Sequence, residues 1–205
     1  ANADEVMVAG MMKPSQPGIP ANWTIYFAVD DCDASAKAAE EAGGKVCAGP
    51  MDIPQVGRFA ALSDPQGAMF CILKGEGGDS QAFDQMKRGH GNWHELMSPD
   101  PKAGLEFYSK LFGWMASTAM DMGPMGTYQL FSHDGKDIGG MMGQGNAPMP
   151  CWLPYFATEG VDAAIERIKA GGGAIVHGPS EVPGGAWITV AHDPQGAHFT
   201  IVGPK

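Results

Sequence analysis

One long segment of this sequence occurs twice. Trp23–Leu73 and Trp152–Val202 align without a gap at an offset of 129 residues, with 18 identities in 51 positions. Both copies carry Trp-x-x-Tyr-Phe-Ala at their start and Asp-Pro-Gln-Gly-Ala towards their end. A repeat of this length indicates two copies of one supersecondary plan. The spacing is too wide for a solenoid, so we expect a tandem of domains.

The second copy predicts a strand, a helix and three further strands. A strand is expected over Trp152–Thr158 and a helix over Val161–Ala170, ended by glycines, and the remaining strands are Ala174–His177, Ala186–Ala191 and His198–Val202. Asp-Pro-Gln-Gly fits the preferences of a type I turn. Asp33 and Asp162 are expected to start the helices of the two copies.

Residues 92–150 predict the same order of elements. Asp100 and Pro101 suit the cap and first position of a helix, and Gly113 suits its end. The strands expected around this helix are Trp93–Ser98, Met115–Asp121, Thr127–Ser132 and Asp137–Met142. The order βαβββ therefore occurs twice in residues 92–205, which we expect to form one complete domain.

The first copy has no such unit before it. Met7–Met12 resembles Asp137–Met142, the last strand of the preceding unit. We therefore expect residues 1–74 to be a partial domain, residues 75–91 a linker, and the source protein to be longer, although another chain could supply the unit. Residues 1–73 alone would leave a sheet edge and an apolar face uncovered. They should pack against the second domain or a second chain, as in a homodimer.

Composition excludes several classes of partner. The formal net charge is −10, and Lys and Arg form no cluster of the kind that nucleic-acid binding needs. No apolar run approaches the roughly 18 residues of a membrane span. The four cysteines form no Cys-x-x-Cys motif, which favours buried thiols in a reducing, cytoplasmic compartment.

These patterns together resemble the vicinal oxygen chelate superfamily of glyoxalases, extradiol dioxygenases and bleomycin-resistance proteins. The residues that carry the resemblance are Trp93-x-Glu95-Leu96-x-x-x-Asp100, Phe112-Gly113-Trp114, Trp152-x-x-Tyr155-Phe156 and Asp193-Pro194-Gln195-Gly196-Ala197. The resemblance implies an α+β fold whose paired βαβββ units form sheet-lined cups, here with the first module incomplete.

The superfamily characteristically holds a divalent metal on four side chains at the mouth of the cup. By the resemblance, these positions fall at Trp93, at or next to Leu153, at Thr200 and near Gly139 to Met141. Hard divalent ions prefer oxygen and imidazole donors, and these residues supply no clear set of them. We therefore expect neither the usual metal nor another cofactor.

The cup's other residues suggest where chemistry would occur. Strand alternation puts Trp93, Glu95 and Met97 on one face, and the resemblance indicates that this face lines the cup. The remaining predicted pocket residues are Met141, Tyr155, Val190 and Thr200. A partly desolvated Glu95 could act as a general acid or base; alternatively, it pairs with a local donor and holds the strand.

His198 is the second candidate catalytic residue. It shares the cup-facing parity of Thr200, and its counterpart in the first copy is Met69, so the repeat does not require a histidine. The alternative is a solvent-facing start of a strand. Glu95 and His198 would form an acid/base pair if the strands bring them together. His94, His133, His177 and His192 are expected at the surface or in turns.

Two functions follow as expectations. The first is a protein that binds a small, partly apolar organic molecule without the family's metal. The alternative is an enzyme, a lyase, isomerase or hydroxylase, that uses Glu95 or His198 as an acid/base. A metal-dependent lactoylglutathione-lyase-like activity comes third.

Overall fold

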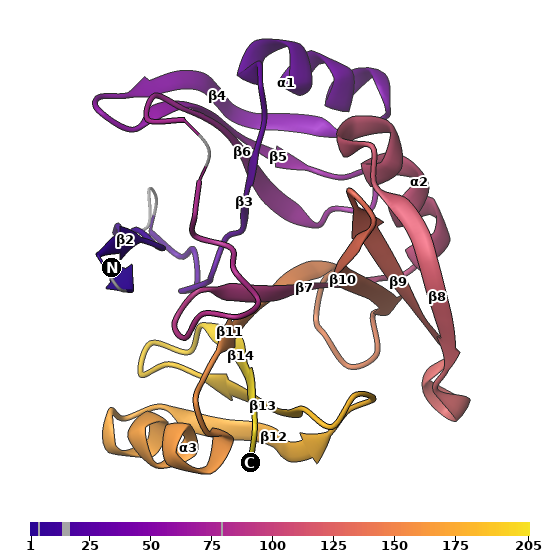
Figure 1. Ribbon diagram of the computed structural model, residues 1–205. Helices are drawn as coiled ribbons and strands as arrows, with labels where there is room; N and C mark the ends of the chain where they lie inside the picture. The colour runs from indigo at the N-terminus through magenta and orange to yellow at the C-terminus, as the bar shows by residue number, and fades with distance from the viewer. Residues whose placement is uncertain (4, 14–16, 79) are drawn as a thin grey trace. The chain divides into compact units, whose positions relative to one another are not determined.

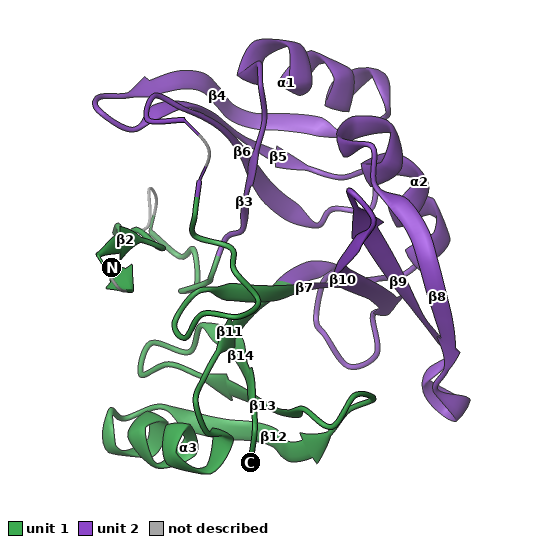
Figure 2. Cartoon of the chain, in the orientation of Figure 1, with its two compact units in different colours: residues 1–23, 81–93, 153–205 green, residues 24–80, 94–152 purple. Residues whose placement is uncertain are grey.

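The computed structural model describes residues 1–3, 5–13, 17–78 and 80–205. The chain divides into two compact units, coloured separately in Figure 2. Unit 1 comprises residues 1–23, 81–93 and 153–205, and unit 2 comprises residues 24–80 and 94–152. From Thr24 onwards, the first copy of the repeat thus packs in one compact unit with residues 94–152. That residues 92–205 form a single complete domain stays a prediction.

Unit 2 contains two βαβββ modules, labelled in Figure 1. The first consists of β3 (Tyr26–Ala28), α1 (Cys32–Glu41), β4 (Lys45–Ile53), β5 (Gly57–Ser63) and β6 (Met69–Gly75). Its strands lie in the order β3-β6-β5-β4, and β3 is parallel to β6. The parallel pairing of first and last strands requires the helical crossover that α1 supplies.

The second module follows the same plan. It consists of β7 (Gly91–Ser98), α2 (Pro101–Phe112), β8 (Met115–Asp121), the short 3₁₀ helix η1 (Gly123–Met125), β9 (Thr127–His133) and β10 (Lys136–Gly143). The strand order is β7-β10-β9-β8, with β7 parallel to β10. Residues of β7 from His94 onwards belong to unit 2.

Unit 1 contains the third module, except for its first two residues, Cys151 and Trp152, which belong to unit 2, and a small N-terminal hairpin. The module consists of β11 (Cys151–Ala157), α3 (Val161–Ala170), β12 (Ala174–Glu181), β13 (Trp187–His192) and β14 (His198–Gly203). Its strand order is β12-β13-β14-β11, and β11 is parallel to β14. The hairpin pairs β1 (Asn2–Ala3) with β2 (Val6–Met7). The predicted α+β class and βαβββ order are confirmed.

The helix ends follow local chemistry, with one correction. Asp100 caps α2 by accepting a hydrogen bond from Ala103 N at 3.0 Å, and Gly113 ends it in the left-handed conformation, as predicted. Asp33 and Asp162 lie in the first turns of α1 and α3, as predicted, but each helix begins one residue earlier. Asp31 is the cap, and Asp33 instead pairs with Arg58, Oδ2 to Nε, at 2.6 Å.

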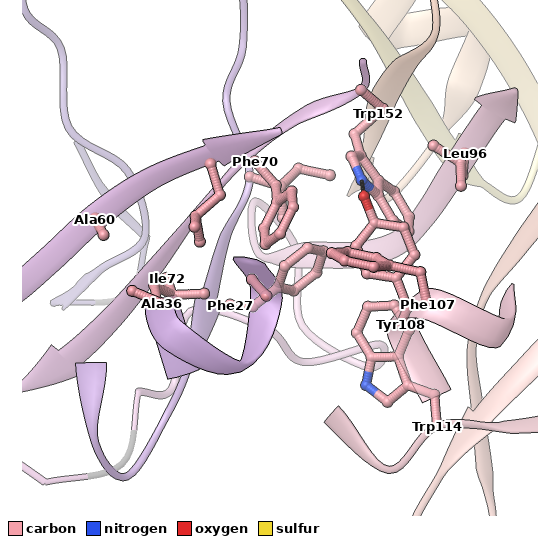
Figure 3. Close-up of a cluster of buried hydrophobic side chains, with 14 of the residues drawn as sticks. Phe27, Ala36, Ala60, Phe70, Ile72, Leu96, Phe107, Tyr108, Trp114 and Trp152 are labelled. Carbon is pink, nitrogen blue, oxygen red and sulfur yellow. Dashed lines mark hydrogen bonds between the residues drawn. The ribbon is translucent and has the colours of Figure 1, made fainter. Parts of the chain in front are cut away.

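The core of unit 2 is an aromatic cluster, shown in Figure 3. Buried rings from its two modules and from the start of β11 interlock in it with centroids 4.9–6.2 Å apart, namely Phe27, Phe70, Phe107, Tyr108, Trp114 and Trp152. Edge-to-face pairs at these distances stabilise more than area burial alone. Unit 1 has its own smaller core, in which Val161, Ala164 and Ile165 of α3 pack on Ile201.

A chain of hydrogen bonds runs through the aromatic cluster. Trp152 Nε1 donates to the Tyr108 hydroxyl at 2.9 Å, and that hydroxyl donates to Asp64 Oδ2 at 3.1 Å. The other Asp64 oxygen accepts from the backbone N–H groups of Gln66 and Ala68, both at 2.9 Å. The buried carboxylate, 3% exposed, is therefore satisfied on both sides. Burial, followed by the nearby Asp64 charge, raises the pKa of Tyr108 well above its usual value, so the donor stays protonated.

Within the described residues, none of the helices has both the length and the apolar character that crossing a bilayer requires. A cytoplasmic location stays a prediction.

Candidate functional site

A buried carboxylate lies on the sheet of the second module in unit 2. Glu95 of β7 is 8% exposed and is registered opposite Gly140 of β10. Met97, two residues along the same face, is opposite Met142 and is half-buried. Leu96 points to the other face and is fully buried in the aromatic core. The side chains of β7 therefore alternate as predicted. Leu96 faces the aromatic core, and Glu95 and Met97 face the opposite side of the sheet.

Tyr128 of β9 gives Glu95 a hydrogen-bond donor. Its hydroxyl donates to Glu95 Oε2 at 3.0 Å. The tyrosine ring lies across the backbone of Gly140, where a Cβ atom would overlap ring carbons and the hydroxyl. Gly140 lacks that atom and so lets the phenol cross β10 and reach the carboxylate on the far strand.

Cys151 completes this cluster within unit 2. Burial, and after it the negative charge of Glu95, raise the pKa of the Cys151 thiol, so the thiol is neutral at physiological pH. A hydrogen-bonded carboxylate and phenol therefore lie beside half-buried methionines, and the neutral thiol is near enough to feel the charge of the carboxylate. This combination can bind a hydroxyl or carbonyl group of a ligand, and the carboxylate can exchange a proton.

The pocket residues predicted in unit 1 share one sheet face. Tyr155 of β11 is opposite Thr200 of β14, which is opposite Val190 of β13. Tyr155 is 5% exposed, Thr200 is fully buried and Val190 is half-buried. Among the described residues, the Thr200 hydroxyl has no hydrogen-bond partner, which is uncommon for a buried donor.

His198 and Trp93 also belong to unit 1. His198 is exposed at the start of β14, and its ring centroid is 5.8 Å from that of His192. Trp93 of β7 is half-buried and precedes Glu95 by two residues on the same strand face. Glu95 and His198 lie in different compact units, and an acid/base pair between them stays a prediction.

Met141 is placed differently from the predicted pocket residues around it. It is registered opposite Leu96 and is fully buried in the core cluster of unit 2. A one-residue step along a strand moves a side chain to the other face. Gly140, not Met141, is therefore the neighbour of Glu95.

The positions carried over from the family's metal site do not fit a hard divalent ion. Trp93 has only an indole N–H, Leu153 is a buried aliphatic residue, Thr200 offers a neutral hydroxyl and Met141 is in the core. None supplies the carboxylate or imidazole that such ions prefer. In the part of the chain that the structure describes, no group of three or more His, Cys, Asp or Glu residues could hold a metal.

His94 was expected at the surface, and that was wrong. It is half-buried on β7, with its Nδ1 3.3 Å from the Ile138 carbonyl oxygen and its ring 5.7 Å from Phe27. Burial lowers the pKa of His94 from 6.5 to about 4, outweighing the opposing hydrogen bond to Ile138. The imidazole is therefore neutral in the folded protein at physiological pH.

A pH dependence follows from this lowered pKa. Between the unfolded value of 6.5 and about 4, the unfolded chain binds a proton on His94 that the folded chain does not bind. The free energy of unfolding should therefore fall as pH drops through this window. Ring-proton NMR should give a His94 midpoint near 4, and urea unfolding of His94→Asn should lose less stability between pH 7 and pH 5 than the parent protein. A His94 midpoint above pH 6 would contradict the prediction.

Sequence reasoning missed Tyr128 and Cys151. The Gly139-Gly140 pair inside β10 was the available signal, because glycine within a strand often marks a close approach of another group. The tyrosine that makes the approach is 12 positions earlier in the sequence, and nothing in the local pattern connects the two.

Comparisons with known proteins identify the family of the chain. The model of the glyoxalase/bleomycin resistance protein/dioxygenase superfamily matches residues 90–201. CFP32 of Mycobacterium tuberculosis, provisionally named a glyoxylase, is 30% identical over 208 residues, which cover 99% of this chain and 78% of CFP32. The anthracycline biosynthesis protein DnrV of Streptomyces peucetius is 35% identical over 190 residues, covering 91% of this chain and 67% of DnrV.

Solved structures agree at the level of the fold. The Mn(II)-bound glyoxalase from Novosphingobium aromaticivorans superposes with a TM-score of 0.61 at 18% identity, over 87% of this chain and 61% of that one. A variant of homoprotocatechuate 2,3-dioxygenase from B. fuscum gives 0.61 at 17% identity, over 90% of this chain and 56% of that one. The family match over more than half of the chain and the 30% identity to CFP32 agree with the βαβββ modules. The protein belongs to the glyoxalase/bleomycin resistance protein/dioxygenase superfamily.

Proposed function

We propose that the protein binds a small, partly apolar organic molecule against the sheet face that carries Glu95 and Tyr128. The observation that supports this most is the hydrogen bond between these two side chains, at 3.0 Å, which runs from β9 across β10 to the buried Glu95 carboxylate on β7. The ligand's polar group would bind at the Glu95 carboxylate, and its apolar part would contact Met97 and Met142. Thioether side chains adapt to ligands of irregular shape.

The cost of this arrangement argues for a role beyond stability. Burying a carboxylate is unfavourable unless it is well paired, and an apolar residue at position 95 would avoid that cost. Glycine at position 140, which weakens a strand, is also needed for the Tyr128 ring to reach Glu95. Two locally unfavourable residues thus hold one polar group in place, as in many binding sites.

A second candidate is an enzyme in which Glu95 transfers a proton. Its support is the position of Glu95, a buried carboxylate that is held by the Tyr128 hydroxyl and could transfer a proton to or from a ligand bound beside it. The relatives' names are consistent with either candidate: DnrV is named for anthracycline biosynthesis and CFP32 for glyoxylase activity. The proposed ligand or substrate is thus an aromatic polyketide of the anthracycline kind or an α-oxoaldehyde adduct. The family's metal is not part of either proposal.

Glu95→Gln tests both candidates. The amide keeps the size and an acceptor for Tyr128 while removing the charge, so the melting temperature should change little. Binding of an anthracycline, followed by the quenching of its fluorescence, should weaken about 10-fold or more through loss of a charge-assisted hydrogen bond. If the protein turns over such a substrate or the hemithioacetal of methylglyoxal and glutathione, the rate should fall about 100-fold or more.

The matched control is Glu166→Gln, which removes the same charge from an exposed carboxylate on α3. It should leave binding and turnover at the parent level. Tyr128→Phe should weaken binding in the same direction as Glu95→Gln, because the carboxylate loses its positioning donor. Unchanged binding and turnover in Glu95→Gln would make Glu95 a structural residue and end the proposal.

A further inference from the structure

A pocket in unit 1 has no role in the function proposed above. Its volume is about 360 Å³, and it opens beside the helix-covered side of the third module. Ala164 and Ile168 of α3 and Ile201 of β14 give it an apolar wall. Arg88, Arg167 and Thr158 supply its polar side. All of these residues belong to the same compact unit.

The charge of this pocket is unusual for the chain. The sequence has a net charge of −10 and contains three arginines, Arg58, Arg88 and Arg167. Arg58 is engaged by two carboxylates, those of Asp33 and Asp52. The other two arginines both line the pocket. The planar fork of a guanidinium matches a carboxylate or phosphate, so two of them in one pocket favour an anion.

Among the described residues of unit 1, both guanidiniums have only weak polar contacts. Arg167 Nη2 donates to the Thr158 hydroxyl at 3.4 Å, the long end of the hydrogen-bond range. Arg88 Nη1 is 3.2 Å from Glu159 Oε2, in an ion pair whose side chains are 61% and 75% exposed. Exposed pairs of this kind contribute little in water, because solvent screens them. An incoming anion could therefore replace Glu159 at Arg88 at small cost.

The internal repeat supplies a comparison. At the 129-residue offset, Ala38 stands in the first copy where Arg167 stands in the second, and Val29 stands where Thr158 does. Ala39, the counterpart of Ile168, is fully buried in the core of unit 2, whereas Ile168 is half-buried. The fold plan therefore demands neither the arginine nor a partly exposed isoleucine at position 168. Both are specific to the second copy.

We propose that this pocket binds a small organic carboxylate with an apolar tail. The carboxylate would lie between the Arg88 and Arg167 guanidiniums, and the tail would lie on Ala164, Ile168 and Ile201. Without the ligand, the Glu159 carboxylate pairs with Arg88. It therefore competes with the ligand's carboxylate for that guanidinium. The ligand class differs from that of the Glu95 site, where a carboxylate would be repelled, so the two sites do not compete.

Octanoate is a suitable probe, titrated into the full chain and followed through the amide resonances of Gly89 and Ala164. We expect saturable binding of one octanoate with both resonances shifting together. Arg167→Gln should weaken the affinity about 10-fold, the usual effect of losing one charge-assisted pair. Glu159→Gln should strengthen it, because the competing carboxylate is gone. Opposite signs from two exposed positions are not a result that general destabilisation produces.

The matched control is Lys169→Gln, on the same helix and paired only with Glu166 among the contacts of the described residues. It removes the same charge as Arg167→Gln outside the pocket, and the affinity should stay within about twofold. Equal weakening by Lys169→Gln would show general attraction to positive charge and overturn the proposal. Unchanged affinity in Arg167→Gln, or inorganic phosphate that competes as strongly as octanoate and so makes no use of the apolar wall, would also overturn it.

Discussion

Replacing Tyr108 with phenylalanine should lower the free energy of unfolding by about 2–4 kcal/mol. The substitution removes one hydroxyl that accepts from Trp152 Nε1 and donates to Asp64 Oδ2. All three side chains are at most 5% exposed, so water cannot replace the lost partner without opening the aromatic core. The buried indole N–H and the buried carboxylate would each lose a hydrogen bond.

Urea unfolding at neutral pH, followed by tryptophan fluorescence, measures this effect. The control is Tyr26→Phe, which deletes the same atom from a ring that is 45% exposed, and should cost less than about 1 kcal/mol. Asp193→Asn is a second control. Asp193 accepts the same turn hydrogen bonds as Asp64, from Gln195 N at 2.8 Å and Ala197 N at 3.0 Å, but it lies outside the aromatic core. Equal losses in Tyr108→Phe and Tyr26→Phe would contradict the importance assigned to the hydrogen-bond chain.

Gly139→Ala should destabilise the protein by about 3 kcal/mol, at the upper end of the usual cost of overpacking. A Cβ atom at Gly139 would overlap the ring of Phe131 and the backbone carbonyl oxygen of His94. Phe131 is fully buried and stacks on Trp114 with centroids 4.6 Å apart, so its ring has no space to move into. The carbonyl belongs to the paired strand β7 and cannot shift without breaking the sheet.

Two glycines of the same strand provide graded controls. Gly143→Ala places its Cβ in open space and should change stability by less than about 1 kcal/mol. Gly140→Ala should fall between the two, because the overlapping group is the Tyr128 ring, which can turn aside at the expense of its bond to Glu95. Thermal or urea unfolding of the three variants tests the order, and a Gly139→Ala protein as stable as Gly143→Ala would refute the packing argument.

Local chemistry explains what could be predicted from this sequence. The Asp-Pro-Gln-Gly-Ala turns at Asp64 and Asp193 formed as expected, because each aspartate bonds backbone groups only two and four residues away. Asp100 begins α2 and Gly113 ends it, also through bonds to backbone groups a few residues away. The difference at Asp33 was small and local: the capping aspartate lies two residues earlier, and the preference for acidic residues in the first turn made both positions plausible.

The candidate site depended on contacts that a local pattern does not contain. Tyr128 reaches Glu95 across 33 positions of sequence, and Tyr108 reaches Asp64 across 44. The sequence also predicted Met141 as a pocket residue, while the strand register turned it into the core. Each of these outcomes depends on which strands are neighbours and in what register, and neither is specified by spacing along one strand.

The amino-acid sequence by itself determined the repeated βαβββ plan, its turns and helix ends, and the face of β7 that carries Glu95. These follow from backbone preferences and side-chain periodicity within about 10 residues. The tertiary structure alone decided that the first copy packs in one unit with residues 94–152, that Tyr128 holds Glu95, and that two of three arginines line one pocket. The physical reason is that these side chains are far apart in the sequence. They interact only after packing has brought their strands and helices together, so no local pattern in the sequence reveals the contact.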